Sequence, residues 1–348
     1  MQRCSWLCIK YKPIIFNLYH DIMLITRTPL RISFTWGWSD LPSFYQKFWW
    51  AVISTTIDKY VYITIHKAFE DVIRLKYSKT EEVDSVEKIE HKYFKEMLKF
   101  YNIENKIEIT SISDIPASWS WLWSSSSFCV GTLHALSVYK WKYISPEELA
   151  QEDCIIEMGK CWQPIWKQDQ YAAAYGWLNF IEFKMDDTVS VSPIICLPET
   201  KKRLSSNLIM LYTWITRSAS NILADQNKNM VSDSKKQDIM KEMVKLTYEL
   251  KKDLENNDLN NFGRLLHENW LLKKEMSWWI SNSQIDEWYD KAMKAWAEWW
   301  KILWAWWGWF LLFYVPKDKQ EDVYSALSDL RKVKFNFDNT WSKVIFIN

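Results

Sequence analysis

The stretch PASWSWLWSSSSF, residues 116–128, decides how the rest of the chain is interpreted. Four consecutive serines, Ser124–Ser127, precede apolar residues at helical spacing. Free backbone N–H groups and the helix dipole at such a start favour an anion. A phosphate-binding loop also needs glycine, whose backbone adopts φ > 0 and approaches the ligand closely. Trp119, Trp121 and Trp123 stand where those glycines would be.

The whole composition shows the same imbalance. The chain has 25 tryptophans and only 6 glycines in 348 residues, whereas ordinary usage of about 7% predicts roughly 24 glycines. The tryptophans cluster in turn-like contexts such as WGW (36–38), WSWLW (119–123) and WAEWWKILWAWWGW (296–309). Setting aside Trp6, Trp270 and Trp288 leaves 22, and with the 6 glycines these make 28, an ordinary glycine content.

We hypothesise that these 22 positions are glycine in the natural protein. UGA encodes tryptophan in some genetic codes and glycine in others, and it differs by one base from the glycine codon GGA. The alternative is that the tryptophans are real and form an aromatic core or binding surface. Tandem indoles would then need large pockets where their neighbours favour tight turns. The codons at positions 119, 121 and 123 decide between the two.

Charge and cysteine usage narrow the class of protein. A net charge of +1 implies no broad attraction to nucleic acid or membrane. The 25% charged and 48% apolar residues are typical of a soluble globular protein, and no segment reaches 18 apolar residues. Six cysteines form no C-x-x-C pair and have no histidine at zinc spacing, which argues against metal binding through them. Scattered reduced thiols are typical of a cytoplasmic protein.

The order of patterns predicts an α+β chain in two domains. Residues 1–22 are expected to be an extension, 23–198 the first domain and 199–348 the second. The first domain should contain strands at Met23–Phe34 and within 51–67, helices at Val130–Tyr139, Pro146–Met158 and Gln168–Tyr175, and a hairpin over 178–195. The second should contain a strand at Asn207–Tyr212, helices near 218–229, 234–256, 261–275, 284–295 and 320–331, a loop over 296–309, and strands at Phe310–Val315, Val333–Phe337 and Lys343–Ile347.

Three separated segments match one family once tryptophan is replaced by glycine. They are PLRISF (29–34) leading into TGGGSDLP, the serine loop as PASGSGLGSSSSF, and KAGAEGGKILGAGGGGF (294–310). In this order they resemble the GHMP kinases, which include galactokinase, homoserine kinase, mevalonate kinase and phosphomevalonate kinase. The resemblance covers about Met23 to Asn348. With KQDQYAAAYGW (167–177) and LHE-x-W-x-x-K (266–273), the chain looks most like the heptose 7-phosphate kinases of that family.

This resemblance implies a two-domain fold, with an N-terminal domain like ribosomal protein S5 domain 2 and a ferredoxin-like C-terminal domain. It implies ATP and Mg²⁺, and phosphorylation of the anomeric hydroxyl of D-glycero-D-manno-heptose 7-phosphate for surface-polysaccharide precursors. Partners would be ATP and a sugar phosphate, without nucleic acid or membrane, and a homodimer is compatible. Alternatives are another GHMP sugar-1-kinase, fucokinase- or galactokinase-like, or, if the tryptophans are real, a non-catalytic carbohydrate- or nucleic-acid-binding protein.

The resemblance also assigns site residues. Asp169 is implied as the base and Arg31 as the cation that stabilises transferred charge, while the alternatives from sequence alone are a helix cap and a surface ion pair. Glu157 and Ser125 would bind Mg²⁺, although Glu157 could instead lie on a solvated helix face. Candidates for substrate binding are Asp40, Lys167 and Arg217. The implied ATP-binding residues are Pro116, Ser118, Trp119, Ser120, Trp121, Leu122, Trp123, Ser124, Ser125 and Ser126.

Overall fold

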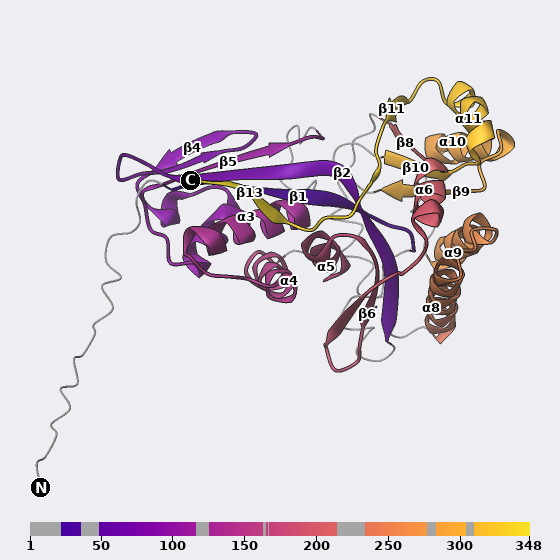
Figure 1. Cartoon of the computed structure of the whole chain (residues 1–348), viewed down its shortest axis with the longest axis horizontal. Coiled ribbons are helices and arrows are strands. Elements are labelled where there is room, and N and C mark those ends of the chain that lie inside the picture. The colour runs from indigo at the N-terminus through magenta and orange to yellow at the C-terminus, as the bar shows by residue number, and fades with distance from the viewer. Residues whose placement is uncertain are drawn as a thin grey trace, which may run out of the picture.

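The fold is built on two sheets with helices packed against them (Figure 1). The computed structural model describes residues 22–35, 49–115, 125–162, 165, 167–213, 234–276, 283–303 and 310–348. Within these residues no helix is long and apolar enough to cross a membrane. Helices and strands from both halves of the chain therefore form an α+β structure, as the sequence predicted.

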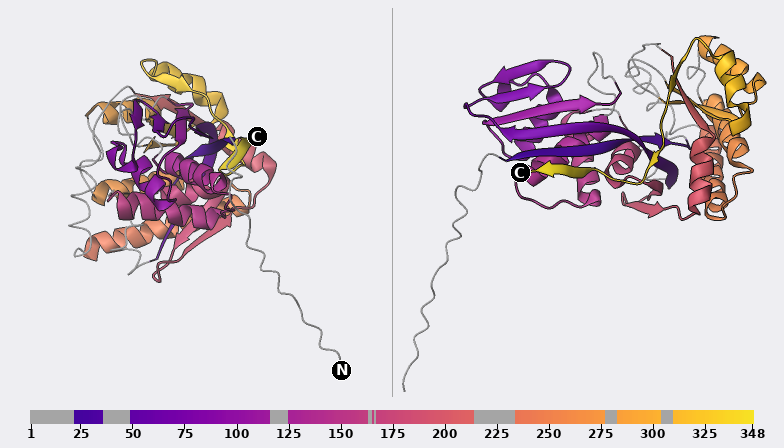
Figure 2. Two further views of the ribbon diagram at one scale, coloured as in Figure 1. Left: turned by 90° about the vertical axis from the view of Figure 1, so that its left-hand side faces the viewer. Right: turned by 45° about the horizontal axis from the view of Figure 1, so that its top comes forward.

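The larger sheet has nine strands, of which six run in the order β13-β1-β2-β5-β3-β4. Its centre is β2 (Trp50–Lys67), whose β-branched and aromatic residues favour a strand. β2 is antiparallel to β1 (Met23–Ser33) and β5 (Ile107–Ser113), and its first residues pair with β6 (Leu178–Phe183). The other members are β3 (Ile73–Lys76), β4 (Thr80–Val83), β7 (Val189–Pro193), β12 (Phe337–Asp338) and β13 (Lys343–Ile347). Figure 2 shows β13 returning beside β1, so the end of the chain completes the first sheet.

Helices cover one face of this sheet: α3 (Ser125–Tyr139), α4 (Pro146–Cys154) and α5 (Lys167–Tyr175), with α2 (Lys92–Phe100) and the short turn η1 (Val86–Lys88) at one end. A π-helical turn, η2 (Ile155–Lys160), continues α4. α3 approaches β1 closely at Gly131, where an added Cβ would lie 2.7 Å from Thr28 Oγ1. The Thr26 hydroxyl donates to the Gly131 carbonyl at 2.9 Å and fixes that contact. The serine-rich start of α3 is thereby held over β1.

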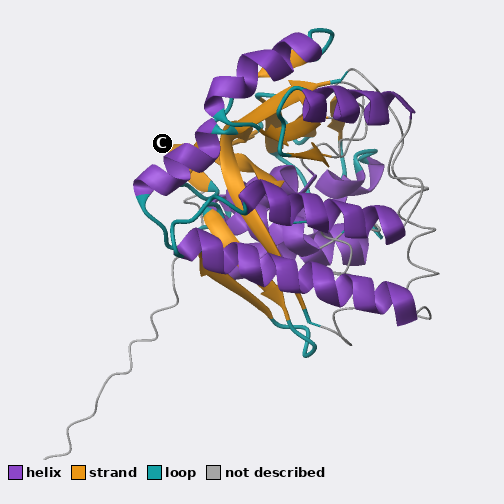
Figure 3. Cartoon of the chain, turned by 90° about the vertical axis from the view of Figure 1, so that its right-hand side faces the viewer, coloured by secondary structure: helices purple, strands orange, loops and turns teal. Residues whose placement is uncertain are grey.

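The smaller sheet has the order β11-β8-β10-β9 and is covered by helices of the second half (Figure 3). Its strands are β8 (Leu208–Tyr212), β9 (Trp299–Leu303), β10 (Phe310–Tyr314) and β11 (Arg331–Val333). The helices are α6 (Pro198–Ser206), α8 (Ser234–Glu255), α9 (Phe262–Met276), α10 (Ser283–Lys294) and α11 (Gln320–Ala326), with the turn η3 (Lys317–Lys319). Every residue of β10 is buried, in keeping with its central place between β8 and β9.

Most predicted elements are found, and the differences have physical reasons. Strand β9 lies inside the stretch 296–309 that was expected to be a loop, because Ile302 and its neighbours gain a full antiparallel pairing with β10. The helix expected over 146–158 changes to π geometry at Ile155. Helix α6 and strand β4 were not expected, although Pro198 at a helix start was a usable signal. The helix expected near 218–229 lies outside the described residues.

Several tryptophans occupy backbone positions that suit glycine. Trp141, Trp162, Trp177 and Trp296 have φ of 56°, 54°, 67° and 75°. Positive φ is an outlier for a bulky residue, because its Cβ crowds the following carbonyl. Their side chains are 64%, 81%, 46% and 62% exposed, so packing does not compensate that strain.

Trp141 and Trp296 each take the left-handed position that closes a helix. The paired backbone bonds typical of this ending run from Lys142 N to Ser137 O (2.9 Å) and Trp141 N to Val138 O (2.8 Å) after α3, and from Ala297 N to Ala292 O (3.0 Å) and Trp296 N to Met293 O (3.3 Å) after α10. Glycine is the usual residue at this position. The backbone therefore supports the glycine hypothesis independently of composition.

The buried tryptophans differ from one another in whether the indole N–H group makes a hydrogen bond. Trp288, which the sequence analysis kept as a true tryptophan, donates its indole N–H to Asp329 Oδ2 at 3.1 Å. Trp299 and Trp300 are fully buried, yet neither indole N–H has a hydrogen-bond partner among the described residues. Buried indole N–H groups normally find an acceptor. Trp299 and Trp300 are thus as buried as core residues, but their indole N–H groups lack the hydrogen bond that a buried tryptophan normally makes.

Candidate active site

The centre of the candidate site is an ion pair between Arg31 and Asp169. Arg31 Nη2 lies 2.7 Å from Asp169 Oδ2, and Arg31 Nε donates to Oδ1 at 3.1 Å. Asp169 lies in the first turn of α5, where the helix dipole favours a carboxylate. Both side chains are less than a third exposed. The pair is therefore an oriented, half-buried bidentate contact and neither a helix cap nor an exposed surface ion pair.

Local backbone geometry aims Arg31 at this point. The register of β1 against β2 shifts between Pro29 and Leu30, just before Arg31. Proline has no N–H to donate to the strand ladder, and such irregularities commonly redirect side chains next to active sites. The carbonyl of Pro29 instead accepts from the Ser127 hydroxyl at 3.0 Å. The strand that carries Arg31 is in this way tied to the serine-rich start of α3.

Glu157 lies on η2, is fully buried, and is linked to the helix that carries Asp169 through Gln170. Its Oε2 accepts from Ser126 Oγ at 3.1 Å and from Gln170 Nε2 at 2.6 Å. Gln170 directly follows Asp169, so α5 positions both the ion pair and the buried glutamate. The solvated helix face that sequence alone left open for Glu157 is wrong, because the π-helical turn directs this side chain inward.

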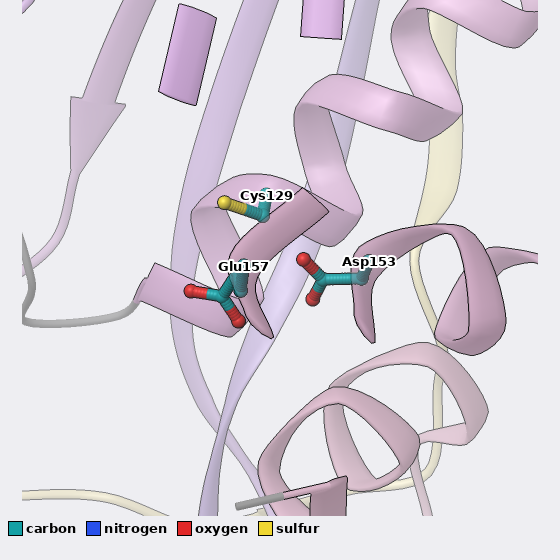
Figure 4. A group of neighbouring side chains, drawn as sticks. All are labelled: Cys129, Asp153 and Glu157. Atoms are coloured by element: carbon teal, nitrogen blue, oxygen red, sulfur yellow. The ribbon is translucent and has the colours of Figure 1, made fainter. Parts of the chain in front are cut away.

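Glu157 also belongs to a cluster of three buried acid groups. One ligand atom each from Cys129 on α3, Asp153 on α4 and Glu157 on η2 lie within 4.8 Å of one another (Figure 4). Burial, together with Glu157, raises the pKa of Asp153 well above the usual carboxyl range. Burial likewise raises the pKa of the Cys129 thiol. The sequence argued against metal binding by cysteine because it has no C-x-x-C pair and no histidine at zinc spacing, and these three residues, spread over 29 positions, are brought together only by the fold.

Lys301 is a residue of the site that sequence reasoning missed. It stands on β9 and is only 6% exposed. Its ammonium donates to the Thr35 carbonyl at 3.1 Å and also to the Ser33 carbonyl at the end of β1. Burial lowers the pKa of Lys301 to about 7, with Asp169 opposing that shift and Arg31 adding to it. The stretch 296–309 was interpreted only as a glycine-rich loop, so its lysine carried no signal.

The remaining predicted residues divide between described and undescribed parts. Lys167 forms an ion pair with Asp187 at 2.6 Å. Ser125 begins α3. Asp40, Arg217 and the loop positions Pro116, Ser118, Trp119, Ser120, Trp121, Leu122, Trp123 and Ser124 lie outside the described residues, so their expected contacts stay predictions. The structure brings together Arg31, Asp169, Glu157 and Ser126 from one end of β1, α3, η2 and α5.

A separate hollow of about 810 Å³ lies away from this centre. It is lined by residues of α6, β8, α11 and the segment 333–339, with Trp177 at its edge. None of the residues of the Arg31–Asp169 pair or of the buried acid cluster lines it. The hollow is therefore separate from the candidate site around the Arg31–Asp169 pair.

Comparison with known proteins supports the same family. No protein-family model matches the chain. It is 27% identical over 317 residues to a D-glycero-alpha-D-manno-heptose 7-phosphate kinase of Campylobacter jejuni, covering 87% of this chain and 92% of that relative. A solved D-glycero-D-manno-heptose 1-phosphate kinase from Bacteroides thetaiotaomicron has a TM-score of 0.75 at 22% identity, over 93% of this chain and 99% of that one.

A more distant enzyme has the same fold. The Methanococcus jannaschii mevalonate kinase aligns with a TM-score of 0.67 at 21% identity, over 91% of this chain and 98% of that one. Near-complete coverage in both directions means that the two-domain architecture is shared, and not one domain alone. By fold, by the order of its motifs and by this full-length similarity, the chain is similar to the GHMP kinases.

Proposed function

We propose that the protein phosphorylates the anomeric hydroxyl of D-glycero-D-manno-heptose 7-phosphate with ATP, supplying a precursor for nucleotide sugars of surface polysaccharide. The observation that carries the chemistry is the bidentate Arg31–Asp169 pair beside the buried Glu157. Phosphoryl transfer needs positioned groups, charge neutralisation and a proton acceptor, and these side chains supply all three. The heptose assignment is supported by the Campylobacter jejuni relative.

In the proposed reaction the sugar oxygen attacks the γ-phosphorus of ATP, and the bond from that phosphorus to the β–γ bridging oxygen breaks. Asp169 accepts the proton of the attacking hydroxyl. Arg31 holds the Asp169 carboxylate in one orientation and places positive charge beside the transferring group. The start of α3 offers N–H groups to the phosphates. Lys167, Asp40 and Arg217 are proposed to contact the sugar phosphate.

Mg²⁺ fits the donor set that the chain provides. Glu157 brings a buried carboxylate, and the adjoining serine helix brings hydroxyl oxygens, with Ser126 already bonded to Glu157. Magnesium prefers oxygen ligands of this kind and shares phosphate oxygens. We assign Glu157 and Ser125 to it. When bound, the ion would neutralise negative charge on the phosphate oxygens.

The test is a substrate panel with ATP on the full-length chain carrying glycine at the 22 positions. The panel contains heptose 7-phosphate, heptose 1-phosphate, unphosphorylated heptose, fucose and galactose, because the names of the two heptose relatives give different phosphate positions. We expect turnover on heptose 7-phosphate, with product phosphorylated at the anomeric oxygen by NMR. Turnover restricted to unphosphorylated fucose or galactose would replace this proposal by a fucokinase- or galactokinase-like activity.

A further inference from the structure

The buried acid cluster of Cys129, Asp153 and Glu157 has a ligand set different from that of a magnesium site. A thiol, with one carboxyl from α4 and one from η2, converges on a space in which the three ligand atoms lie within 4.8 Å of one another (Figure 4). Such spacing fits ligands around one ion, because first-row metals bind at about 2.0–2.3 Å. All three residues are fully buried.

Asp153 is the observation that points to a ligand. Its side chain is fully buried, and neither carboxyl oxygen has a hydrogen-bond partner among the described residues. Buried carboxyls are normally satisfied by donors or by metals. The Cys129 thiol is the polar group that interacts with this carboxyl, and a thiol is only a weak donor. In Figure 4 the Asp153 carboxyl lies on the side of Asp153 that faces Glu157 and Cys129.

The groups that act by charge on Asp153 and Cys129 themselves are all acids. The ionisable neighbours that act on Asp153 by charge are Glu157 and Asp169, both acids. Those that act on Cys129 are Glu157, Asp153 and Cys161, again all acids. A buried group of this kind must take up protons or a cation, since unpaired buried negative charge is costly. Lys167, the positive side chain that acts on the nearby Cys154, is paired with Asp187.

We propose that Cys129, Asp153 and Glu157 bind a thiophilic divalent cation such as Zn²⁺ or Co²⁺, at a second position that shares Glu157 with the proposed Mg²⁺ site. Thiolate ligands select zinc-like ions over magnesium, whereas carboxylate alone does not. The set of one sulfur and two carboxylate oxygens leaves further coordination positions for water. Glu157 would then join the thiophilic site to the serine-rich start of α3 through Ser126. The site would stabilise the contact among α3, α4 and η2.

The experiment is cobalt titration of the full-length, metal-stripped protein without ATP or sugar, followed by electronic absorption. We expect one Co²⁺ per chain and a thiolate-to-cobalt charge-transfer band in the near ultraviolet. Zn²⁺ should displace it, and Mg²⁺ in large excess should not. Because none of the three ligands is one of the tryptophan positions and no substrate is added, failure of the kinase proposal would leave this result unaffected.

Two variants and a matched control locate the ligands. Cys129→Ser should abolish the charge-transfer band, and Asp153→Asn should keep the band while weakening cobalt binding by about 100-fold. Cys196→Ser, at a half-buried cysteine outside the cluster, should change neither. Absence of the band in the unsubstituted protein, or its loss in Cys196→Ser, would overturn the proposal. The unsubstituted protein already decides the matter if Cys129→Ser does not fold.

Discussion

Four helix ends in this protein have the same backbone and two different kinds of residue. After α2 and α8 the left-handed closing position is Asn102 (φ 51°) and Asn257 (φ 63°), and after α3 and α10 it is Trp141 (φ 56°) and Trp296 (φ 75°). At the asparagine ends the paired bonds are Ile103 N to Leu98 O (2.9 Å), Asn102 N to Lys99 O (3.1 Å), Asp258 N to Asp253 O (2.9 Å) and Asn257 N to Leu254 O (3.0 Å).

The comparison of these helix ends shows where the residue type in the printed sequence does not suit the backbone conformation. Asparagine tolerates the left-handed region because its short polar side chain bonds locally, whereas an indole cannot hydrogen-bond the local backbone in this way, and among the described residues Trp296 has only a cation–π contact with Lys319 at 5.2 Å. The active centre shows no such backbone conflict: Arg31 pairs with Asp169, and Glu157 accepts two hydrogen bonds through Oε2. The chemistry of the site and the glycine hypothesis can therefore be tested separately.

The largest expected effect is on activity. The chain as printed should be inactive, because an indole at each glycine position of the serine loop would be expected to block the space through which phosphate must enter. Glycine at all 22 positions should raise ATP turnover from background to a rate typical of kinases, about 1–100 s⁻¹. Equal ATP binding by the two versions, measured by calorimetry, would mean that the tryptophans belong to the protein. The gene offers a direct check, with UGA expected at these positions and UGG at 270 and 288.

Removing the proposed base is expected to have the next largest effect. In the glycine version Asp169→Asn should lower kcat by about 10²–10⁴-fold, since the acceptor for the hydroxyl proton is lost. The Arg31 contact through one oxygen remains, so ATP affinity should change little. Asp187→Asn, at the exposed partner of Lys167, is the control and should keep near-normal kcat. Unchanged kcat in Asp169→Asn, under conditions where chemistry limits turnover, would remove Asp169 from the mechanism.

Lys301 lies in the stretch richest in tryptophan, and substituting it tests whether this stretch contributes to the active site. As a positioning residue that ties β9 to the carbonyls after β1, it should affect kcat more than the KM for ATP. We expect Lys301→Met to lower kcat by about 10–100-fold, because a shift of the reacting groups by about 1 Å lowers the rate by a factor of this size. Lys301→Arg should recover part of the loss, and Lys252→Met on the exposed face of α8 should have no effect.

Lys301 also predicts how stability depends on pH. Its pKa is lowered to about 7 in the folded protein, against about 10.4 in an unfolded chain. Between these values the unfolded state binds more protons, so the free energy of unfolding should rise with pH from about 7 to 10. Denaturant titrations of Lys301→Met should lack this rise. If the free energy of unfolding of Lys301→Met instead rose with pH in parallel with that of the parent, the pKa of Lys301 would not be lowered in the folded protein.

The smallest effects concern the helix ends themselves. Trp141→Gly and Trp296→Gly should each raise the free energy of unfolding by about 1 kcal/mol, because the cost of positive φ disappears. Asn102→Gly and Asn257→Gly should change it by only a few tenths of a kcal/mol, about the difference between two residues that both suit this position. Urea denaturation at constant m-value is the measurement. Equal changes in both pairs would end the contrast between asparagine and tryptophan.

Much of the fold was available from local pattern. β-branched runs predicted β1 and β2, and the helices of the second half followed from their apolar spacing, because these signals depend only on the period of the side chains. The sequence missed β9, where residues between tryptophans form a strand only because β10 lies beside them. It could not predict that the last strand, β13, returns to pair with β1, since the two are separated by more than 300 positions.

By itself, the sequence supplied the order of the three motifs, the resemblance to the GHMP kinases, and the roles that this resemblance implies for Arg31, Asp169 and Glu157, because residue types and spacings are local facts. The tertiary structure alone decided that Arg31 and Asp169 pair, that Lys301 closes on the end of β1, and that Cys129 meets Asp153 and Glu157. These contacts join distant segments, and only packing of the sheets and helices brings them within reach. The glycine hypothesis rests on both the sequence and the structure. The composition suggested it, and the positive φ at Trp141 and Trp296 supports it with a backbone conformation that suits glycine.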